Sequence, residues 1–236
     1  MSKTAIILAG GKGTRLRPYT VVLPKPLMPI GDYPILEVII RKLAASGFSK
    51  IIMAVNHQAD IIKAYFGDGS KWNIEIVYSL EEKPLSTMGP LKLIKDLPEN
   101  FLIMNGDVLS DINFSNLFDE HVAEKNIFTI SGFNRQLKSE YGVLNLDNSN
   151  YLNDFKEKPV FDLMVSMGIY IANKKILELI PSDQPYGFDH LMYDLLKAKN
   201  PPKVKLHNGY WLDIGRPDDY MQAIDDLANN KISLND

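Results

Sequence analysis

The chain of 236 residues contains no cysteine. This absence excludes disulfide bonds and thiolate metal sites, and it makes the cytoplasm the default location. Long apolar runs are also missing, because no stretch approaches the roughly 18 residues that a membrane-spanning helix needs. The apolar run Ala5–Ala9 is too short for the hydrophobic core of a secretory signal. We therefore expect no membrane partner.

Acidic residues are absent from positions 1–31, although the whole chain carries a net charge of −3. The remainder of the chain has 21 basic residues against 29 acidic ones. A net negative charge argues against binding of bulk nucleic acid, so we expect no nucleic-acid partner. The cationic first segment instead favours a local anionic ligand, and the alternative is a solvated basic N-terminus. Its five basic residues are Lys3, Lys12, Arg15, Arg17 and Lys25.

Short apolar runs alternate with helical patterns over the first 135 residues. Thr4–Ala9 is typical of a buried strand, and Pro34–Ser46 has apolar residues at helical spacing with Gly47 directly after it. Strands that alternate with helices predict an α/β fold, with a Rossmann-like, mostly parallel sheet flanked by helices. We expect further strands at 50–56, 74–79, 101–104 and 127–133, and further helices at 59–66, 91–95 and 114–125.

The pattern changes after about residue 140. Two strand-like segments, 142–146 and 151–157, flank the turn-rich Asp147–Asn150 and predict a hairpin. We therefore expect one domain over residues 1–236, in which a nucleotide-type half (1–135) precedes a smaller, more antiparallel half (136–236) that completes a second subsite. Further strands are predicted at 165–172 and 211–214, and further helices at 188–198 and 217–227.

The stretch Ile7–Pro18 reads ILAGGKGTRLRP, an apolar run followed by three glycines and three cationic side chains. Glycines beside basic residues are typical of a loop that binds phosphate. A Walker A loop is excluded, because the chain contains no Gly-Lys-Ser/Thr. A dinucleotide fingerprint is excluded as well, because Leu16 stands where GxGxxG needs its last glycine.

Ile7–Pro18 and the following Leu23–Leu27 (LPKPL) together resemble the signature of sugar-1-phosphate nucleotidylyltransferases, most closely short members of the mannose-1-phosphate guanylyltransferase type. That family converts an NTP and a sugar 1-phosphate into an NDP-sugar and pyrophosphate. The resemblance therefore implies the nucleotidyltransferase fold, with residues 1–135 binding the NTP and residues 136–236 binding the sugar phosphate. Further blocks follow in the order of the family: Glu81…Pro84-Leu85, Gly89, Asn105-Gly106-Asp107, Tyr141-Gly142-Val143, Glu157-Lys158-Pro159, Gly168-Ile169-Tyr170 and Trp211–Gly215.

The implied reaction needs no general base, because an ionised phosphate oxygen attacks the α-phosphorus, and positioning and electrostatics carry the catalysis. Arg15 suits the leaving pyrophosphate, since its planar fork matches two phosphate oxygens. Lys25 lies between two prolines that fix the backbone, and the resemblance places it near the α-phosphate. The glycines of the loop let backbone N–H groups approach the triphosphate. The implied nucleotide-binding residues are Leu8, Ala9, Gly10, Gly11, Gly13, Thr14, Glu81, Ser86, Thr87 and Gly106.

Asp107 follows an apolar strand, at the carboxyl end where a ligand is expected. A carboxylate beside two phosphorylated substrates is repulsive unless it binds Mg²⁺. The resemblance implies that Asp213 is a second metal-binding carboxylate, so we expect Mg²⁺ as the cofactor, held by Asp107 and Asp213. The alternative for each is an aspartate that caps a turn. The catalytic residues that we expect are Arg15, Lys25 and Asp107.

The resemblance assigns the sugar phosphate to the second half of the chain. Lys158 is expected to pair with the phosphate and Glu157 with sugar hydroxyls, while Gly142 lets the backbone approach the ring. Ser166 stands where many relatives have an asparagine that contacts the sugar. The four histidines, His57 and His190 among them, show no ligand spacing and are assigned no role.

The expected base-binding loop departs from the family, since residues 84–89 read PLSTMG where relatives usually have PLGTAG. Ser86 replaces a glycine near the base and Met88 replaces a small residue, so both are expected to affect substrate preference. Glu81 aligns with the residue that reads the base edge. A carboxylate only accepts hydrogen bonds, and guanine offers two adjacent donors, whereas uracil and thymine present one donor between acceptors. We therefore predict that the NTP is GTP.

Two other functions stay open. One is a non-catalytic regulatory subunit with the same fold. Loss of a catalytic cation or of a metal-binding carboxylate would indicate such a subunit, and this sequence has lost none of them. The other is a cytidylyl, uridylyl or thymidylyl transferase that acts on another phosphorylated acceptor, such as phosphocholine. Such an acceptor site favours aromatic and acidic groups over the block Glu157–Pro159. Homo-oligomers are common in the family, so we also allow for one.

Overall fold

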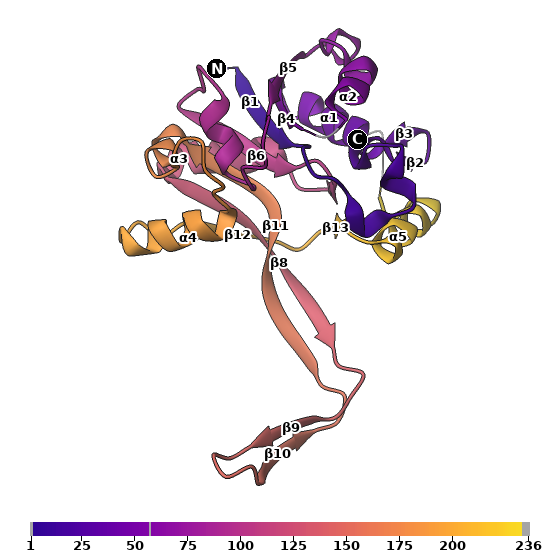
Figure 1. Cartoon of the computed structure of the whole chain (residues 1–236), viewed down its shortest axis with the longest axis vertical. Coiled ribbons are helices and arrows are strands. Elements are labelled where there is room, and N and C mark those ends of the chain that lie inside the picture. The colour runs from indigo at the N-terminus through magenta and orange to yellow at the C-terminus, as the bar shows by residue number, and fades with distance from the viewer. Residues whose placement is uncertain (1, 57, 233–236) are drawn as a thin grey trace.

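The computed structural model describes residues 2–56 and 58–232, so His57 lies outside the described residues. Figure 1 shows a layered body of helices around a sheet, from which a long two-stranded arm extends. No helix among the described residues is long and apolar enough to cross a membrane.

A seven-stranded sheet in the order β12-β8-β11-β6-β1-β4-β5 forms the centre of the body. Within it β11 runs antiparallel to its neighbours β8 and β6, and the other four neighbouring pairs are parallel. The predicted α/β fold with a mostly parallel sheet is thus confirmed, and the sheet joins strands from both halves of the chain. Its strands are β1 (Lys3–Leu8), β4 (Phe48–Val55), β5 (Glu75–Leu80), β6 (Asn100–Asn105), β8 (Phe128–Lys138), β11 (Val160–Asn173) and β12 (Lys203–His207).

Two hydrophobic cores lie on opposite faces of this sheet, because successive residues of a strand point to opposite sides. In β1, Ala5 and Ile7 belong to the first core and Ile6 to the second. Helices α1, α2, α3 and α5 complete the first core, and α4 with two 3₁₀ segments completes the second. These elements are α1 (Ile35–Ala45), α2 (Ala59–Phe66), α3 (Phe114–Glu124), α4 (Phe188–Lys197), α5 (Pro217–Ala228), η5 (Gly89–Leu93) and η6 (Lys174–Glu178).

Most predicted elements of the body are confirmed, and Gly47 follows α1 with the left-handed φ of 81° that such a position favours. The segment predicted as a helix at 91–95 is the 3₁₀ segment η5, whose first turn contains Pro90. Four strands were not predicted, because three of them have two or three residues and the fourth lies at the sheet edge. They are β2 (Pro29–Ile30), β3 (Tyr33–Pro34), β7 (Val108–Ser110) and β12.

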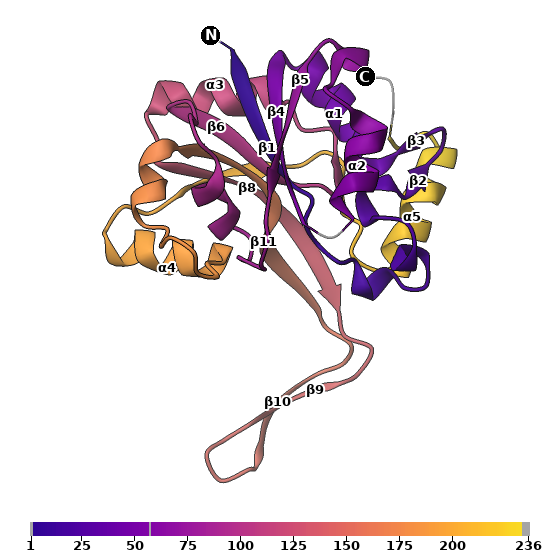
Figure 2. The same ribbon diagram turned by 45° about the horizontal axis from the view of Figure 1, so that its top comes forward.

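Strands β8 and β11 continue beyond the sheet as a two-stranded ribbon that carries the hairpin of β9 (Val143–Leu146) and β10 (Leu152–Lys156) at its end. We call residues 134–164 the arm, and both views show it projecting from the body (Figures 1 and 2). The predicted hairpin is confirmed. The strand predicted at 127–133 ends too early and the one predicted at 165–172 begins too late, because the added residues of β8 and β11 pair only with each other, outside the cores.

Candidate active site

A pocket of about 450 Å³ opens where β1, β4, β5 and β6 end. The carboxyl ends of parallel strands meet at one edge of a sheet, and ligands of α/β proteins bind there. Six of the predicted nucleotide-binding residues line this pocket together with Asp107. The full lining is Leu8, Gly10, Gly11, Lys12, Ala54, Asn56, Glu81, Pro84, Ser86, Thr87, Asn105 and Asp107.

Two other predicted nucleotide-binding residues, Ala9 and Gly106, form backbone hydrogen bonds that hold neighbouring strand ends together at this edge. The Ala9 N–H donates to the Ala54 carbonyl at 2.9 Å, and the Gly106 N–H donates to the Leu8 carbonyl at 3.0 Å. Both residues are buried, so they support the pocket from behind rather than line it.

The loop after β1 bends at Gly13, which has a left-handed φ of 59°. A Cβ at this position would lie 3.0 Å from Cγ2 of Thr20, so both the backbone angle and the space favour glycine. The Thr20 hydroxyl donates to the Gly13 carbonyl at 2.6 Å. The 3₁₀ turn η1 (Thr14–Leu16) begins directly afterwards, and its buried Leu16 anchors the loop while Arg15 stays exposed.

The guanidinium of Arg15 lies against Gly215, since a Cβ on Gly215 would be 3.4–3.6 Å from its Nη1, Nη2 and Cζ atoms. Gly215 comes shortly after β13 (Trp211–Asp213), which pairs antiparallel with β7. The fold therefore brings the N-terminal phosphate loop and a segment 200 positions later to the same place.

Lys25 is the first residue of the 3₁₀ turn η3 (Lys25–Leu27), and its side chain is largely buried. Its ammonium forms an ion pair with Oδ2 of Asp107. A predicted catalytic cation and a predicted metal-binding carboxylate thus contact each other directly.

Asp213 completes a cluster of four charged residues. The β7–β13 pairing places it opposite Val108, which directly follows Asp107. Burial raises the pKa of Asp213, the negative charge of Asp107 raises it further, and the positive charges of Lys25 and Arg15 lower it. Asp219 also raises this pKa through its negative charge. Because Asp107, Lys25 and Arg15 all act on Asp213 through their charge, these four side chains share one electrostatic site.

The two aspartates of this cluster are suited to a divalent cation. Oδ1 of Asp107 is buried and has no hydrogen-bond partner, a situation that costs free energy unless another group binds it. Within the described ranges, no group of three or more His, Asp or Glu side chains is arranged to hold a metal alone. A cation here would complete its shell with phosphate and water oxygens, which is the usual pattern for Mg²⁺ beside nucleotides.

Glu81 lines the pocket but is only 9% exposed. Its Oε1 accepts the backbone N–H of Leu85, while Oε2 faces Gly10, where a Cβ would lie 3.2 Å away. Burial raises the pKa of Glu81, and the Leu85 N–H lowers it. Glu81 therefore also holds the loop that follows it, a role that the sequence did not indicate, and it keeps one oxygen free of that bond.

The loop 84–89 closes one side of the pocket. Ser86 has a φ of 65°, the left-handed conformation that residues with a side chain rarely adopt. The Thr87 hydroxyl accepts the N–H of Phe188 at 3.1 Å and so joins the loop to the start of α4. Met88 is fully buried in the second core and does not line the pocket, contrary to the expectation that it shapes the base site.

Ser166, one of the predicted sugar-phosphate residues, is exposed on β11 close to the charged cluster. Its hydroxyl donates to that of Tyr170 at 3.0 Å. Burial raises the pKa of Tyr170, the bond from Ser166 lowers it, and the nearby charge of Asp213 raises it. Ser166 is thus connected to the cluster through one tyrosine.

The other predicted sugar-phosphate residues lie on the arm. Gly142 and Glu157 are neighbours, since a Cβ on Gly142 would be 3.2 Å from Oε2 of Glu157. Lys158 follows in the turn before β11, with a φ of 42°. The structure brings these three residues to one another but not to the charged cluster, and their contact with a sugar phosphate stays a prediction.

Four residues of the site were missed from the sequence: Asn56, Asn105, Thr20 and Gly215. The Asn56 amide donates to the Glu81 carbonyl at 2.8 Å, and both asparagines line the pocket. Each asparagine stands at the carboxyl end of a predicted parallel strand, and this position was a usable signal. Gly215 ends the block Trp211–Gly215, but its contact with Arg15 exists only in the folded chain, and no local pattern marks Thr20.

The chain is an α/β protein with glycines, cations and carboxylates gathered at the carboxyl edge of its sheet, an arrangement that suits a phosphorylated ligand. A family model described as nucleotidyl transferase matches residues 4–230, and the chain belongs to this family.

Named relatives and solved structures are similar over most of the chain. A UTP–glucose-1-phosphate uridylyltransferase from Synechocystis sp. is 33% identical and aligns with 97% of this chain and 64% of its own length. A mannose-1-phosphate guanyltransferase from Candida albicans is 35% identical, over 92% of this chain and 62% of its own length. The structure of HddC from Yersinia pseudotuberculosis complexed with GMP-PN has a TM-score of 0.73 at 27% identity, covering 95% of this chain and 99% of that one. The chain thus spans slightly less than two thirds of the length of these curated relatives.

Proposed function

We propose that this protein transfers a nucleotidyl group from an NTP to a sugar 1-phosphate and releases pyrophosphate. The observation that carries the proposal is the convergence of Arg15, Lys25, Asp107 and Asp213 at the end of the nucleotide-type pocket. The names of the relatives, a uridylyltransferase and a guanyltransferase of sugar 1-phosphates, support the same reaction class.

In the proposed reaction, a phosphate oxygen of the sugar 1-phosphate attacks the α-phosphorus of the NTP. The bond from the α-phosphorus to the bridging oxygen breaks, and pyrophosphate leaves with that oxygen. Arg15 neutralises the leaving pyrophosphate from its exposed position on the phosphate loop. Lys25 forms an ion pair with Asp107 in the resting site, and in the proposed reaction its ammonium also binds the reacting phosphates.

We infer that the divalent ion of this reaction is Mg²⁺ and that Asp107 and Asp213 hold it. The partnerless Oδ1 of Asp107 and the raised pKa of Asp213 support this pair, since both features are relieved by a cation. When bound, the ion would supply Lewis-acid polarisation of the α-phosphate and neutralise crowded charge. The protein's own contribution is to hold two carboxylates side by side.

We infer that GTP is the preferred NTP. Oε2 of Glu81 is available beside Gly10, and a carboxylate oxygen with two lone pairs suits the adjacent N1–H and N2–H donors of guanine. The guanyltransferase from Candida albicans and the HddC complex with GMP-PN support a guanine nucleotide. In this view residues 1–135 supply the NTP site, and residues 136–236, with Ser166, supply the acceptor contacts.

One assay tests the reaction class. Purified protein, Mg²⁺, each of five NTPs and a panel of sugar 1-phosphates are screened for pyrophosphate release. We expect release that depends on both substrates and that falls by at least about 100-fold in Asp107→Asn. Absence of release with every pair would favour a regulatory subunit instead.

A second variant tests the base preference. Glu81→Gln keeps an oxygen that can accept the Leu85 N–H but replaces an acceptor with a donor. We expect the ratio of kcat/KM for GTP over UTP to fall about 10- to 100-fold. Glu82→Gln is the matched control, because the neighbouring carboxylate is exposed and does not line this pocket. A wild-type preference for UTP or dTTP, or an unchanged ratio in Glu81→Gln, would contradict the assignment.

A further inference from the structure

Thr20 is a buried polar residue in a largely exposed stretch of the chain. It is 4% exposed, and within residues 11–20 it is one of two buried residues. It lies in the 3₁₀ turn η2 (Tyr19–Val21), between the turn that carries Arg15 and the turn that begins with Lys25. A buried hydroxyl gives up its hydrogen bonds to water, so it needs a partner inside the protein.

The partner of this hydroxyl is the backbone carbonyl of Gly13. The Thr20 hydroxyl donates to the carbonyl oxygen at 2.6 Å, and the Leu16 N–H donates to the same oxygen at 2.9 Å. A carbonyl oxygen has two lone pairs, so the two donors together fix the direction in which it points. This direction is toward the buried side of the loop, where Thr20 and Leu16 lie.

The same two hydrogen bonds determine where the N–H of Thr14 points. The peptide bond between Gly13 and Thr14 is trans, so its N–H points away from its carbonyl oxygen. The Thr14 N–H is therefore turned away from the buried Thr20, and it donates to no residue among 2–56 and 58–232. Outward-pointing N–H groups of a glycine-containing turn are suited to bind phosphate.

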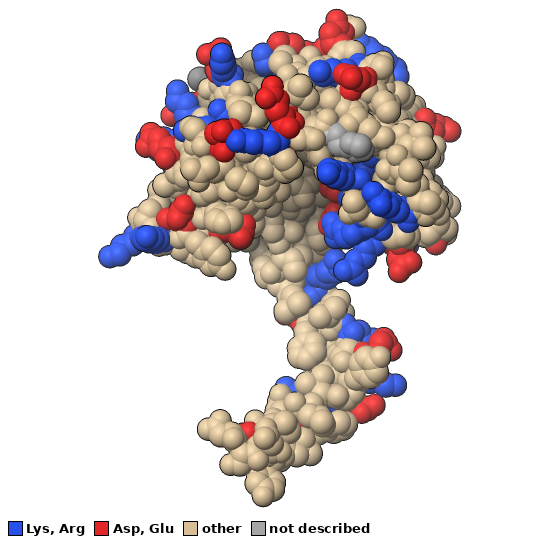
Figure 3. All heavy atoms as spheres, in the orientation of Figure 1, with Lys and Arg blue, Asp and Glu red and all other residues tan. Residues whose placement is uncertain are grey.

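Thr20 also lies where two cationic turns meet. A Cβ on Gly13 would be 3.0 Å from Cγ2 of Thr20, and it would be 3.2 Å from Cβ of Thr20 and from Cβ of Lys25. Figure 3 shows Lys and Arg side chains gathered on the body next to the base of the arm, where Figure 1 places the loop after β1. Thr20 thus packs at the junction between the turn of Arg15 and the turn of Lys25.

We propose that Thr20 is a positioning residue for the pyrophosphate part of the NTP. Its hydroxyl holds the Gly13–Thr14 peptide so that the Thr14 N–H faces the phosphates and the turn of Arg15 keeps its place beside Lys25. Thr20 acts through this peptide and touches no substrate itself, because it is buried. The role rests on the function proposed above, since it concerns the group that leaves in that reaction.

Two substitutions of Thr20 test the hydroxyl without any assay of transfer. Thr20→Val replaces the hydroxyl by a methyl group of similar size, whereas Thr20→Ser keeps the donor. We expect the Kd for pyrophosphate with Mg²⁺, measured by calorimetry, to rise about 10-fold in Thr20→Val. In Thr20→Ser it should stay close to the wild-type value. If Thr20→Val does not fold, Thr20→Ala removes the same donor without the added methyl. A folded variant that lacks the hydroxyl and keeps the wild-type Kd would overturn the proposal.

The wild type provides a test that needs no variant. In amide NMR spectra, the Thr14 N–H should shift downfield when pyrophosphate and Mg²⁺ are added, because it gains a charged acceptor. The Leu16 N–H is the internal control, since it already donates to Gly13 and should shift little. A Thr14 signal that does not move would overturn the proposed orientation of this peptide.

Transfer kinetics test whether the hydroxyl contributes to the reaction. The substrates are GTP with mannose 1-phosphate or glucose 1-phosphate, the sugar phosphates in the names of the relatives. We expect Thr20→Val to lower kcat/KM for GTP about 10- to 100-fold while the KM for the sugar phosphate is unchanged. Added to Arg15→Ala, Thr20→Val should cost clearly less than in the wild type, because both residues serve the same pyrophosphate.

The outcomes separate this role from the proposed function. Equal costs of Thr20→Val with and without Arg15, or a loss confined to the KM for the sugar phosphate, would overturn the positioning role. If the wild type binds pyrophosphate but transfers no nucleotidyl group, the proposed function fails. The calorimetric comparison of Thr20→Val with Thr20→Ser then still decides whether Thr20 positions the phosphate-binding peptide.

Discussion

Ser86 adopts a backbone conformation that glycine adopts more easily. Its φ of 65° costs a residue with a side chain about 1–2 kcal/mol, and this serine lines the nucleotide pocket. The serine hydroxyl thus lies at the nucleotide pocket at a cost in stability.

We expect Ser86→Gly to raise the free energy of unfolding by about 0.5–1 kcal/mol, after the entropy of glycine in the unfolded chain is subtracted. Ser86→Ala is the control, because alanine keeps the strain and loses only the hydroxyl. Urea denaturation of both variants measures the difference. Equal stability of the two variants would show that the left-handed angle carries no strain.

His121 is a fully buried residue of α3 that no proposed activity uses. Its Nδ1 bonds the Thr129 hydroxyl at 2.8 Å, and its buried Nε2 has no partner. Burial lowers the pKa of His121 to about 4, against an opposing effect of the negative Glu124. The folded protein therefore keeps this imidazole neutral at pH 7.

A histidine with a lowered pKa makes stability depend on pH. The folded state excludes a proton that the unfolded chain binds below pH 6.5, so this stabilisation is complete above pH 6.5 and is lost as the pH falls toward 4. We expect the wild type to lose about 2 kcal/mol more than His121→Asn between pH 7 and pH 5. Asparagine keeps a polar atom near Thr129 without a titrating ring. Denaturant titrations at both pH values measure this difference. An equal loss of unfolding free energy in the two proteins would contradict this pKa.

The roles of single residues were predictable where the residues belong to a sequence motif. They were unpredictable where the role depends on a contact that only folding creates. Arg15, Lys25 and Asp107 follow from short sequence blocks, and the structure places them in one cluster. The bond of Glu81 to Leu85 was not foreseen, since a side chain that accepts from a backbone four positions away leaves no periodic pattern.

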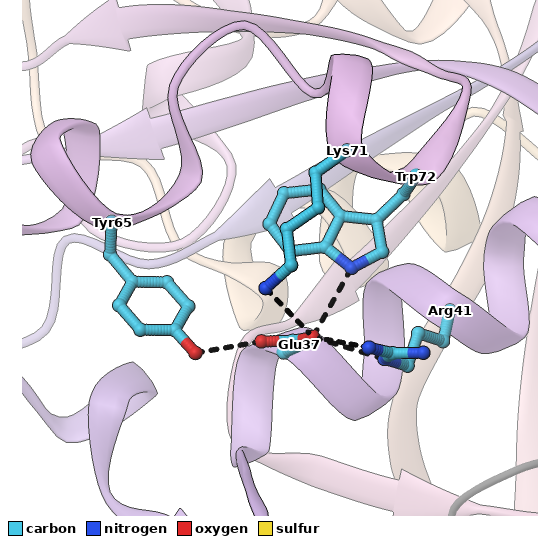
Figure 4. A network of polar contacts seen from close by, with 5 residues as sticks. All are labelled: Glu37, Arg41, Tyr65, Lys71 and Trp72. Atoms are coloured by element: carbon cyan, nitrogen blue, oxygen red, sulfur yellow. Dashed lines mark hydrogen bonds and ion pairs between the residues drawn. The ribbon is translucent and has the colours of Figure 1, made fainter.

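Three elements of the first core are joined through one buried carboxylate (Figure 4). Glu37 of α1 accepts hydrogen bonds from Tyr65 of α2 at 2.7 Å and from Arg41 at 2.7 Å. Trp72 and Lys71 of the 3₁₀ turn η4 (Ser70–Trp72) bind it at 3.3 and 3.5 Å. Burial raises the pKa of Glu37, but these bonds outweigh it and hold the pKa below its usual value. Burial, together with the hydrogen bond to the negative Glu37, raises the pKa of Tyr65 to about 12.

We expect Glu37→Gln to lower the free energy of unfolding by about 2–4 kcal/mol, because the buried donors lose their charged acceptor. Glu75→Gln is the matched control, since Glu75 forms an exposed pair with Lys50 at 3.0 Å. Such a pair contributes about 0.5 kcal/mol or less. Denaturant titration at pH 7 measures both variants, and similar losses would refute a structural role for the Glu37 cluster.

Helices and strands whose apolar residues recur at a regular spacing were predictable from the sequence. Contacts between these elements were not. The apolar spacing in α1 predicted the helix, but the same period puts Glu37 outside the apolar face. It is buried because α2 and η4 pack over that side. The outer residues of β8 and β11 were missed for the opposite reason, since their partner is only the other strand of the arm.

The order of the strands in the sheet determines where the residues of the candidate active site lie in the molecule. The carboxyl ends of β1, β4, β5 and β6 form one edge, and β7 with β13 adds Asp107 and Asp213 to it. The α/β class was predictable from alternating elements. The direction of the arm was not, because it follows from the pairing of β8 with β11 beyond the sheet, from Ser166 opposite Gly132 to Val160 opposite Lys138.

In the proposed reaction, an acceptor phosphate attacks the α-phosphorus of an NTP. The most direct measurement uses a sugar 1-phosphate with ¹⁸O in its phosphate group, incubated with GTP, Mg²⁺ and the protein. The products are then separated, and their ¹⁸O content is measured by mass spectrometry. We predict that all ¹⁸O stays in the NDP-sugar and that the pyrophosphate carries none. Appearance of ¹⁸O in pyrophosphate or inorganic phosphate, or failure to form an NDP-sugar with any nucleotide tested, would contradict the account.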